Sequence, residues 1–216
     1  MPVERNLLHA QRHIRTLALA TACAELGARL RTIQLLTGLA PSHLQRLFRQ
    51  PLEGPRRGRH PDSREWYHTA NLLYRTEASI VVALYSRLAS RGIDPPYALV
   101  GAYRHYRSAC LSTPRITFDR AFDLVAHTAG RWLVSVRSFS VFTCPSCHSE
   151  YLSGLSLAPT SNSDCPFCKL LTRYARDPRV RAAYPLRSMP HDVQAPWPHT
   201  ADHALHGLPP MSNSPN

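Results

Sequence analysis

Apolar residues recur at helical spacing over much of this 216-residue chain. In residues 5–36, Leu7 and Ile14 belong to such a series, and Gly27 marks a break between a long first helix and a shorter second one. Residues 63–90 predict a further helix on the same grounds. These patterns favour helix over strand for the first part of the chain.

Helix-start signals extend this pattern. Asp94 as N-cap, with Pro95 in the first turn, predicts a helix that runs to about Leu111, and another helix is expected from about Thr117. We therefore expect a mainly α fold whose helical domain covers residues 1–136.

Residues 29–50, "RLRTIQLLTGLAPSHLQRLFRQ", have the layout of a helix-turn-helix. Gly38 punctuates the turn, and Ser42 with Gln45 forms a capping-box signature for the second helix. In such a unit the second helix enters the major groove, and a plain helical hairpin gives the same pattern from packing alone. The candidate DNA contacts on this segment are His43, Gln45, Arg46 and Arg49.

Residues 137–177 change character. The alternating, β-branched stretch "VSVRSFSVFTC" predicts a strand that leads into two Cys-Pro-X-Cys pairs, Cys144 with Cys147 and Cys165 with Cys168. Their C-x2-C-x17-C-x2-C spacing is typical of a zinc ribbon, in which two turns aim four thiolates at one tetrahedral ion. Four sulfur ligands leave no open position, so one structural Zn²⁺ per chain is expected.

Other roles for the cysteines fit less well. A thioredoxin-like pair normally occurs once beside a βαβ unit, and structural disulfides need an oxidising compartment. His148 is a substitute ligand that four cysteines make unnecessary, so we expect a surface histidine. Cys23 and Cys110 lie within helical patterns and are expected to be small buried apolar residues.

The charge of the chain points to a polyanionic partner. The net charge is +12 at pH 7, and Lys169 is the only lysine. Arginine suits phosphate oxygens and guanine edges. A GC-rich genome can favour arginine over lysine, but it does not explain why basic residues outnumber acidic ones. In the loop "GPRRGRHP", Arg56, Arg57 and Arg59 are candidate phosphate contacts, with a solvated basic loop as the alternative.

Enzyme signatures are weak. The sequence shows no Ser-His-Asp, P-loop or GxGxxG pattern. Asp119 and Asp123, one helical turn apart, are expected to form a solvated helix face beside Arg120. No apolar run is long enough to span a bilayer, and the first residues lack the apolar core of a secretory signal, so a cytoplasmic protein without membrane contact is expected. The Pro-rich residues 178–216 predict a disordered tail with at most short structured fragments.

Several segments, taken in order, resemble the FlhC family, the larger subunit of a bacterial flagellar master regulator. The resemblance covers roughly residues 12 to 170 and leaves the Pro-rich tail unmatched. It rests on "LGARLRTIQLLTGLAPSHLQRLFRQ", "SREWYHTANLLYRTEASIVVALY", "GAYRHYRSAC", "RAFDLVAHTAGRWL" and the four-cysteine ending.

The resemblance implies a non-enzymatic transcription activator. Such chains assemble with an FlhD-like subunit, four FlhD with two FlhC, and the complex binds and bends flagellar promoter DNA and recruits RNA polymerase. It also implies that Cys144, Cys147, Cys165 and Cys168 hold the zinc. The alternative function is a zinc-ribbon module that binds nucleic acid or protein without promoter specificity.

Overall fold

The computed structural model describes residues 2–49, 65–110, 113–155 and 165–185. These residues belong to one unit, Met1–Pro185. Arg56, Arg57 and Arg59 lie outside the described residues, as does the tail from residue 186. The fold is mainly α-helical with one two-stranded sheet, as the sequence predicts.

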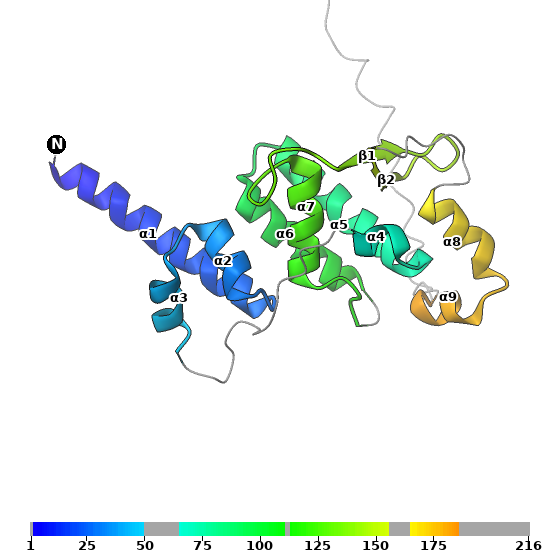
Figure 1. Cartoon of the computed structure of the whole chain (residues 1–216), viewed down its shortest axis with the longest axis horizontal. Coiled ribbons are helices and arrows are strands. Elements are labelled where there is room, and N and C mark those ends of the chain that lie inside the picture. Colours follow the sequence, from blue (N-terminus) through cyan, green and yellow to red (C-terminus); the bar gives the residue numbers. More distant parts are fainter. Residues whose placement is uncertain (1, 50–64, 111–112, 156–164, 186–216) are drawn as a thin grey trace, which may run out of the picture. The chain divides into compact units, whose positions relative to one another are not determined.

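The predicted break at Gly27 is confirmed. Helix α1 spans Pro2–Glu25 and helix α2 spans Leu30–Thr37. Gly27 between them has φ 82°, a left-handed conformation that L side chains rarely adopt. The end of α1 packs on α2 and α6 (Pro95–Ala109), His13 lies near His43 of α3 (Pro41–Leu47), and the first turns of α1 extend away from the other helices (Figure 1).

The single helix expected over residues 63–90 is two helices. Helix α4 spans Glu65–Thr69 and helix α5 spans Leu72–Ser90. The physical reason is a cap. The side chain of Asn71 accepts a hydrogen bond from the backbone N–H of Tyr74, so the chain ends one helix and begins another there.

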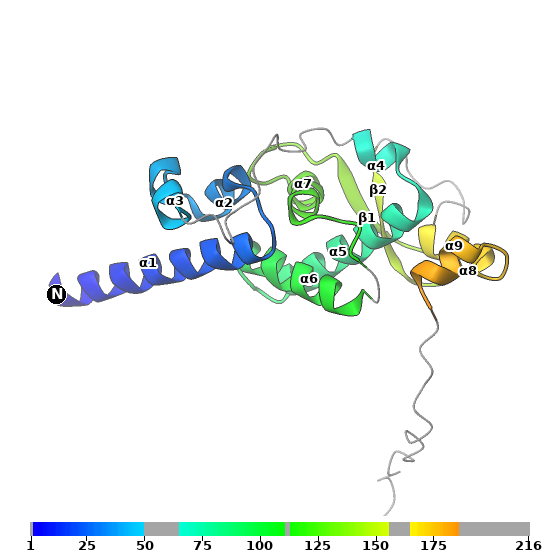
Figure 2. The same cartoon turned by 90° about the horizontal axis from the view of Figure 1, so that it is seen from below.

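Helix α5 lies at the centre of the core. It packs against α6 (Pro95–Ala109) and α7 (Phe118–Ala129), and on the sheet of β1 (Phe139–Thr143) and β2 (Glu150–Gly154) (Figures 1 and 2). The strands are antiparallel. Large, fully buried apolar and aromatic side chains come from α4, α6, α7 and both strands: Tyr67, Leu99, Tyr106, Phe118, Phe122, Phe139 and Leu152.

Two short helices follow the second cysteine pair. Helix α8 spans Pro166–Tyr174 and packs on α5, and helix α9 spans Pro178–Ala183 and packs on α8. Helix α9 belongs to the predicted tail and is a short structured fragment of it. Its Val180 and Ala183 are buried. The boundary expected between residues 136 and 137 stays a prediction.

No helix among the described residues has the length and apolar character needed to cross a membrane.

Candidate metal centre and nucleic-acid surface

The fold brings the two cysteine pairs together. The Sγ atoms of Cys144, Cys147, Cys165 and Cys168 all lie within 4.8 Å of one another. The Sγ atoms of Cys144 and Cys168 are 3.7 Å apart, and so are those of Cys147 and Cys165. Four ligands 2.3 Å from a tetrahedral ion stand about 3.8 Å apart, whereas disulfide sulfurs stand about 2.05 Å apart. The four sulfurs therefore have the spacing of ligands around one metal ion.

Local backbone geometry aims the first pair. Cys144 follows directly after β1, and its N–H donates to the carbonyl of Ser149. The chain then turns tightly: the backbone N–H of His148 donates a hydrogen bond to the carbonyl of Cys144, and His148 has φ 56°. His148 itself is exposed. The turn thus holds both sulfurs of the pair on one side.

The second pair is aimed by a helix start. Cys165 is the N-cap residue of α8, and Pro166 takes the first helical position, where its missing N–H costs nothing. Cys168 then lies one turn further along the helix. Phe142, Tyr151 and Phe167 pack around the cluster and form a small apolar shell separate from the main core.

The thiols differ in how easily they lose a proton. The Cys147 N–H holds the pKa of Cys144 below its usual range, and the Ser149 side chain, as the largest cause, lowers the pKa of Cys147 to about 6. Burial raises the pKa of Cys165, and the Cys147 side chain raises the pKa of Cys168 to about 12. Four thiolates so close together would repel one another, and a cation among the sulfurs would provide the charge that they need.

The helix-turn-helix layout is present over α2 and α3 (Pro41–Leu47), joined at Gly38, which has φ 71°. The predicted capping box is wrong. The helix begins one residue before Ser42, with Ala40 as the N-cap residue and Pro41 at the first position, and no side chain caps it. Leu44 is buried and fixes α3 in place.

The candidate DNA contacts on α3 divide into two groups. Gln45, Arg46 and Arg49 are exposed. His43 is half-buried and its ring lies 5.7 Å from that of His13 on α1, so it faces another helix. The exposed three are free to meet a ligand, and their contact with DNA stays a prediction.

The solvated acidic face expected at Asp119 and Asp123 is wrong, because both are 1% exposed. Asp119 accepts hydrogen bonds from the Arg29 N–H at 3.0 Å, the Arg29 guanidinium at 3.1 Å and the Thr32 hydroxyl at 2.6 Å. It thereby caps the start of α2 from α7. The position of the α2–α3 segment therefore depends on a carboxylate 90 residues away along the chain.

Glu77 is a second buried carboxylate, which the sequence analysis did not single out. Its carboxylate accepts hydrogen bonds from the backbone N–H of Arg115 at 2.9 Å and from the Arg115 guanidinium at 2.5 Å. It also accepts hydrogen bonds from the hydroxyls of Tyr106 and Tyr184. Burial, with Glu77 as a further cause, raises the pKa of both tyrosines. The sequence does contain one sign that Glu77 is buried: it is the only acid in α5, a largely apolar helix.

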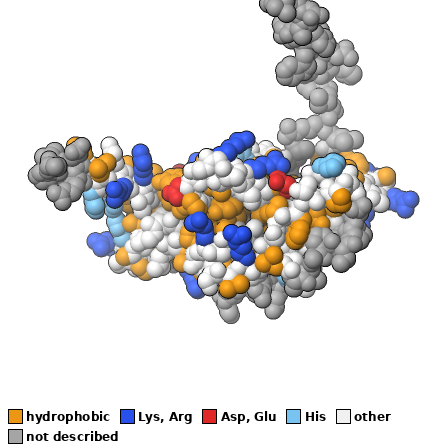
Figure 3. Space-filling view, turned by 90° about the horizontal axis from the view of Figure 1, so that it is seen from above, with side chains coloured by type: hydrophobic (Ala, Val, Ile, Leu, Met, Phe, Trp, Pro, Cys, Tyr) orange, Lys and Arg blue, Asp and Glu red, His pale blue; other side chains and the backbone are white. Residues whose placement is uncertain are grey.

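Three of the acids, Glu77, Asp119 and Asp123, are buried. Glu77 and Asp119 each pair with an arginine, Arg115 and Arg29, so these two arginines add little to the charge of the surface. Figure 3 shows Lys and Arg side chains spread over one face with few acidic ones among them. A surface of this kind suits a polyanion.

Comparison with known proteins gives the family. The family model described as flagellar transcriptional activator (FlhC) matches residues 5–181. The chain belongs to the FlhC family. The matched range includes α2 and α3, the core around α5, the four cysteines and α8. A search of curated proteins finds no match to the chain.

Proposed function

We propose that this FlhC chain is the DNA-contacting subunit of a hetero-oligomeric activator. With an FlhD-like partner, four FlhD with two FlhC, it binds and bends flagellar promoter DNA and recruits RNA polymerase in the cytoplasm. The observation that carries the proposal is the family match over residues 5–181. The basic surface and an exposed apolar helix face, described below, support its two contacts.

The DNA contact is assigned to the α3 side of the helix-turn-helix and to the basic loop. Gln45, Arg46 and Arg49 are exposed on or next to α3, and within the described residues the Arg46 guanidinium donates to the carbonyl of Ser42 on its own helix. Asp119 holds α2 rigidly, so α3 is presented from a fixed base. Arg56, Arg57 and Arg59 follow in sequence as further phosphate contacts.

Promoter binding with the partner present tests this function. We expect the complex to bind a flagellar promoter fragment more tightly than random DNA of equal length. In the variant Arg46→Gln/Arg49→Gln we expect the salt dependence of binding to fall by about one unit of slope for each lost phosphate contact. Fluorescence anisotropy over a salt series measures both.

The exposed arginine Arg91, on a different element, provides the control. The Arg91→Gln variant should keep the parent slope. Equal affinity of the complex for promoter and random DNA would overturn promoter recognition and leave the interaction module as the better description. An unchanged slope in Arg46→Gln/Arg49→Gln would remove α3 from the interface.

The partner contact is assigned to the first turns of α1. Every side chain from Asn6 to Arg15 is exposed, including Leu7 at 58%, Leu8 at 49% and Ile14 at 64%. Leu7 and Ile14 are seven residues apart and share one side of the helix. An apolar stripe on a helix that extends away from its own core fits a helical partner subunit such as FlhD.

Leu7→Glu/Ile14→Glu should therefore prevent assembly without unfolding the chain, because neither side chain packs in the core. Burying each is worth roughly 1.5–3 kcal/mol, so we expect at least a hundredfold weaker association. Native mass measurement after co-expression detects the complex. The His9→Glu variant alters the opposite side of the helix and should assemble normally. Full assembly of the double variant would exclude this surface.

We further propose that the metal is one structural Zn²⁺ per chain. Four thiolates select zinc or an iron–sulfur cluster, and the tetrahedral spacing of the sulfurs suits a single ion. Such an ion has no open coordination position, so it would hold β1, β2 and α8 together and supply no catalysis.

A further inference from the structure

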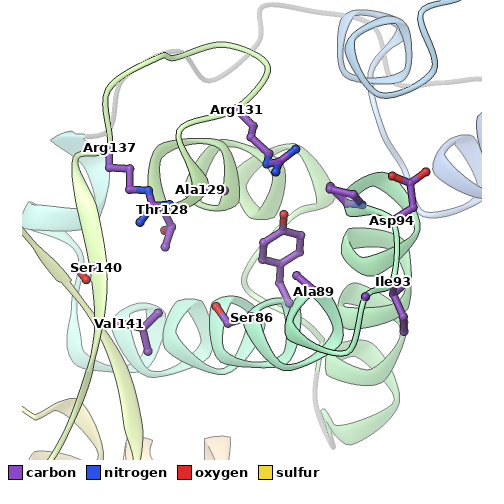
Figure 4. Close-up of a pocket in the computed structure, with 13 residues that line it drawn as sticks. Ser86, Ala89, Ile93, Asp94, Thr128, Ala129, Arg131, Arg137, Ser140 and Val141 are labelled. Carbon is purple, nitrogen blue, oxygen red and sulfur yellow. The ribbon is translucent and has the colours of Figure 1, made fainter.

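A hollow of about 720 Å³ lies beside α5, away from the four cysteines and from α3. It is open to solvent and is bordered by the second half of α5, the turn into α6, the end of α7 and strand β1 (Figure 4). Pockets that hold small organic molecules measure roughly 300–1,000 Å³. We call this hollow the arginine pocket, because Arg131 and Arg137 are its only basic lining residues.

The loop that carries these arginines is tightly built. Gly130 ends α7 at φ 66°, and the N–H groups of Gly130 and Arg131 both donate to the carbonyl of Ala126. Trp132 follows at φ 60°, an uncommon conformation for a bulky residue, and its ring packs 5.3 Å from that of Phe122. This backbone positions Arg131, and it begins the loop that leads to Arg137.

Backbone contacts also fix the second arginine. The N–H of Ser138 donates to the carbonyl of His127 at 2.9 Å. A side chain at Gly130 would come within 3.3 Å of the Arg137 Cγ, so glycine leaves room for the arginine stem to pass. Both guanidiniums reach over the hollow from the loop between α7 and β1 (Figure 4).

The charge at this end of the pocket is uncompensated. Neither arginine forms an ion pair with a carboxylate in the described part of the chain. Tyr85 lines the same hollow and is 5% exposed, and its hydroxyl has no hydrogen-bond partner among the described residues. Burial raises the pKa of Tyr85, and Arg131 acts on it in the opposite direction. The hydroxyl therefore stays protonated beside a guanidinium and can donate to an anion.

The remainder of the lining is apolar or weakly polar. Ala89, Ile93, Ala129 and Val141 provide apolar surface, and Ser86 and Ser140 add hydroxyls. Asp94, the one acid in the lining, lies away from Arg137 and on the Arg131 side of the hollow (Figure 4). A ligand that fits both regions carries its negative charge at the arginines and an apolar body along α5. The phosphate backbone of DNA offers no such body.

We propose that the arginine pocket binds a small organic anion, one carboxylate, sulfonate or phosphate group attached to an apolar body, independently of DNA. The guanidiniums hold the anion, since arginine forks suit planar and tetrahedral oxyanions. The Tyr85 hydroxyl adds a donor, and Ala89 and Val141 contact the body. This site goes beyond promoter binding, and it gives the activator a means to respond to a metabolite.

The probe for the test is anilinonaphthalene sulfonate, which has one anionic group on an aromatic body and becomes fluorescent in apolar sites. It is titrated into the full zinc-loaded chain in complex with its partner, so that the α1 stripe is covered. We expect saturable binding at one site per FlhC chain by calorimetry. Arg131→Gln/Arg137→Gln should weaken binding at least tenfold, while Arg91→Gln, beside the pocket but outside its lining, should not.

Two comparisons keep the test specific. The same dye without its sulfonate group should bind the parent and Arg131→Gln/Arg137→Gln alike, because only the charge contact is removed. Ser86→Leu, which fills the floor, should weaken both dyes. A change of less than twofold for the sulfonate in Arg131→Gln/Arg137→Gln would overturn the proposal. So would a loss of promoter affinity in that variant with unchanged dye binding, which would assign the arginines to DNA.

Discussion

Replacement of Cys165 and Cys168 by serine is expected to remove the metal and unfold the segment around it. The zinc content measured by elemental analysis should fall from one ion per FlhC chain to none. Zinc binding supplies about 10–16 kcal/mol of apparent folding free energy in small zinc peptides. Only Cys144, Tyr151 and Cys165 are buried in the apolar cluster at this centre, so little else there can replace the ion. We expect the melting temperature to fall by about 10 °C or more.

The unfolding should be local. The Tyr67 hydroxyl donates to the Leu152 carbonyl at 2.5 Å, and the Leu152 N–H donates to the Ser79 hydroxyl at 3.1 Å. These bonds tie the middle of the hairpin to the helical core, whereas the four-cysteine centre lies beyond the Thr143–Glu150 end of the hairpin. Limited proteolysis should therefore cut the variant between Cys144 and Pro185 and spare α5, α6 and α7.

Cys110→Ser is the matched control, because Cys110 is a half-buried cysteine outside the cluster. It should retain one zinc per chain and nearly the parent melting temperature. A Cys165→Ser/Cys168→Ser protein that is soluble, metal-free and melts normally would show that the four-cysteine centre does not support the fold.

Glu77→Gln is expected to destabilise the zinc-loaded complex by about 3 kcal/mol, the low end of the range for breaking a buried ion pair. The carboxylate neutralises Arg115 and accepts from two tyrosines, and its side chain is 2% exposed. An amide keeps the size but leaves the guanidinium without its counter-charge. For a chain of this length the melting temperature should fall by roughly 6–12 °C at fixed protein concentration.

Glu25→Gln is the control, because it removes a carboxylate from an exposed ion pair. The Glu25 carboxylate lies 3.8 Å from the Arg104 guanidinium, and both side chains are more than half exposed. Its effect should stay within about 1 kcal/mol. Adding Arg115→Met to Glu77→Gln should recover part of the lost stability, because the unpaired charge is then gone. Equal melting of Glu77→Gln and Glu25→Gln would show that the buried network contributes little.

Sequence analysis identified the four cysteines that the fold brings together, because their signals are local. Two C-x2-C turns aim their own sulfurs, and only the closure between them needs the fold. Gly27 and Gly38 were also informative, since a left-handed backbone favours glycine wherever it occurs. The order of helices and the family followed from such short-range features.

Capping was predicted less well. The Ser42–Gln45 signature and the Asn71 cap are equally short patterns, yet only Asn71 has its side chain on a backbone N–H. Pro41 takes the first helical position and shifts the α3 start ahead of Ser42, and no comparable residue precedes Asn71. A cap motif therefore competes with its neighbours, and spacing alone does not decide the outcome.

The sequence by itself determined the helical class, the four-cysteine centre and the excess of positive charge. Only the tertiary structure decided which charges remain at the surface. Asp119 and Asp123 have the spacing of a solvated face, but α7 turns them inward, and Asp119 meets Arg29 across 90 positions. Glu77 likewise collects partners from α6, α9 and the segment before α7. Periodicity shows which residues share a face, whereas burial depends on what the rest of the chain packs against that face.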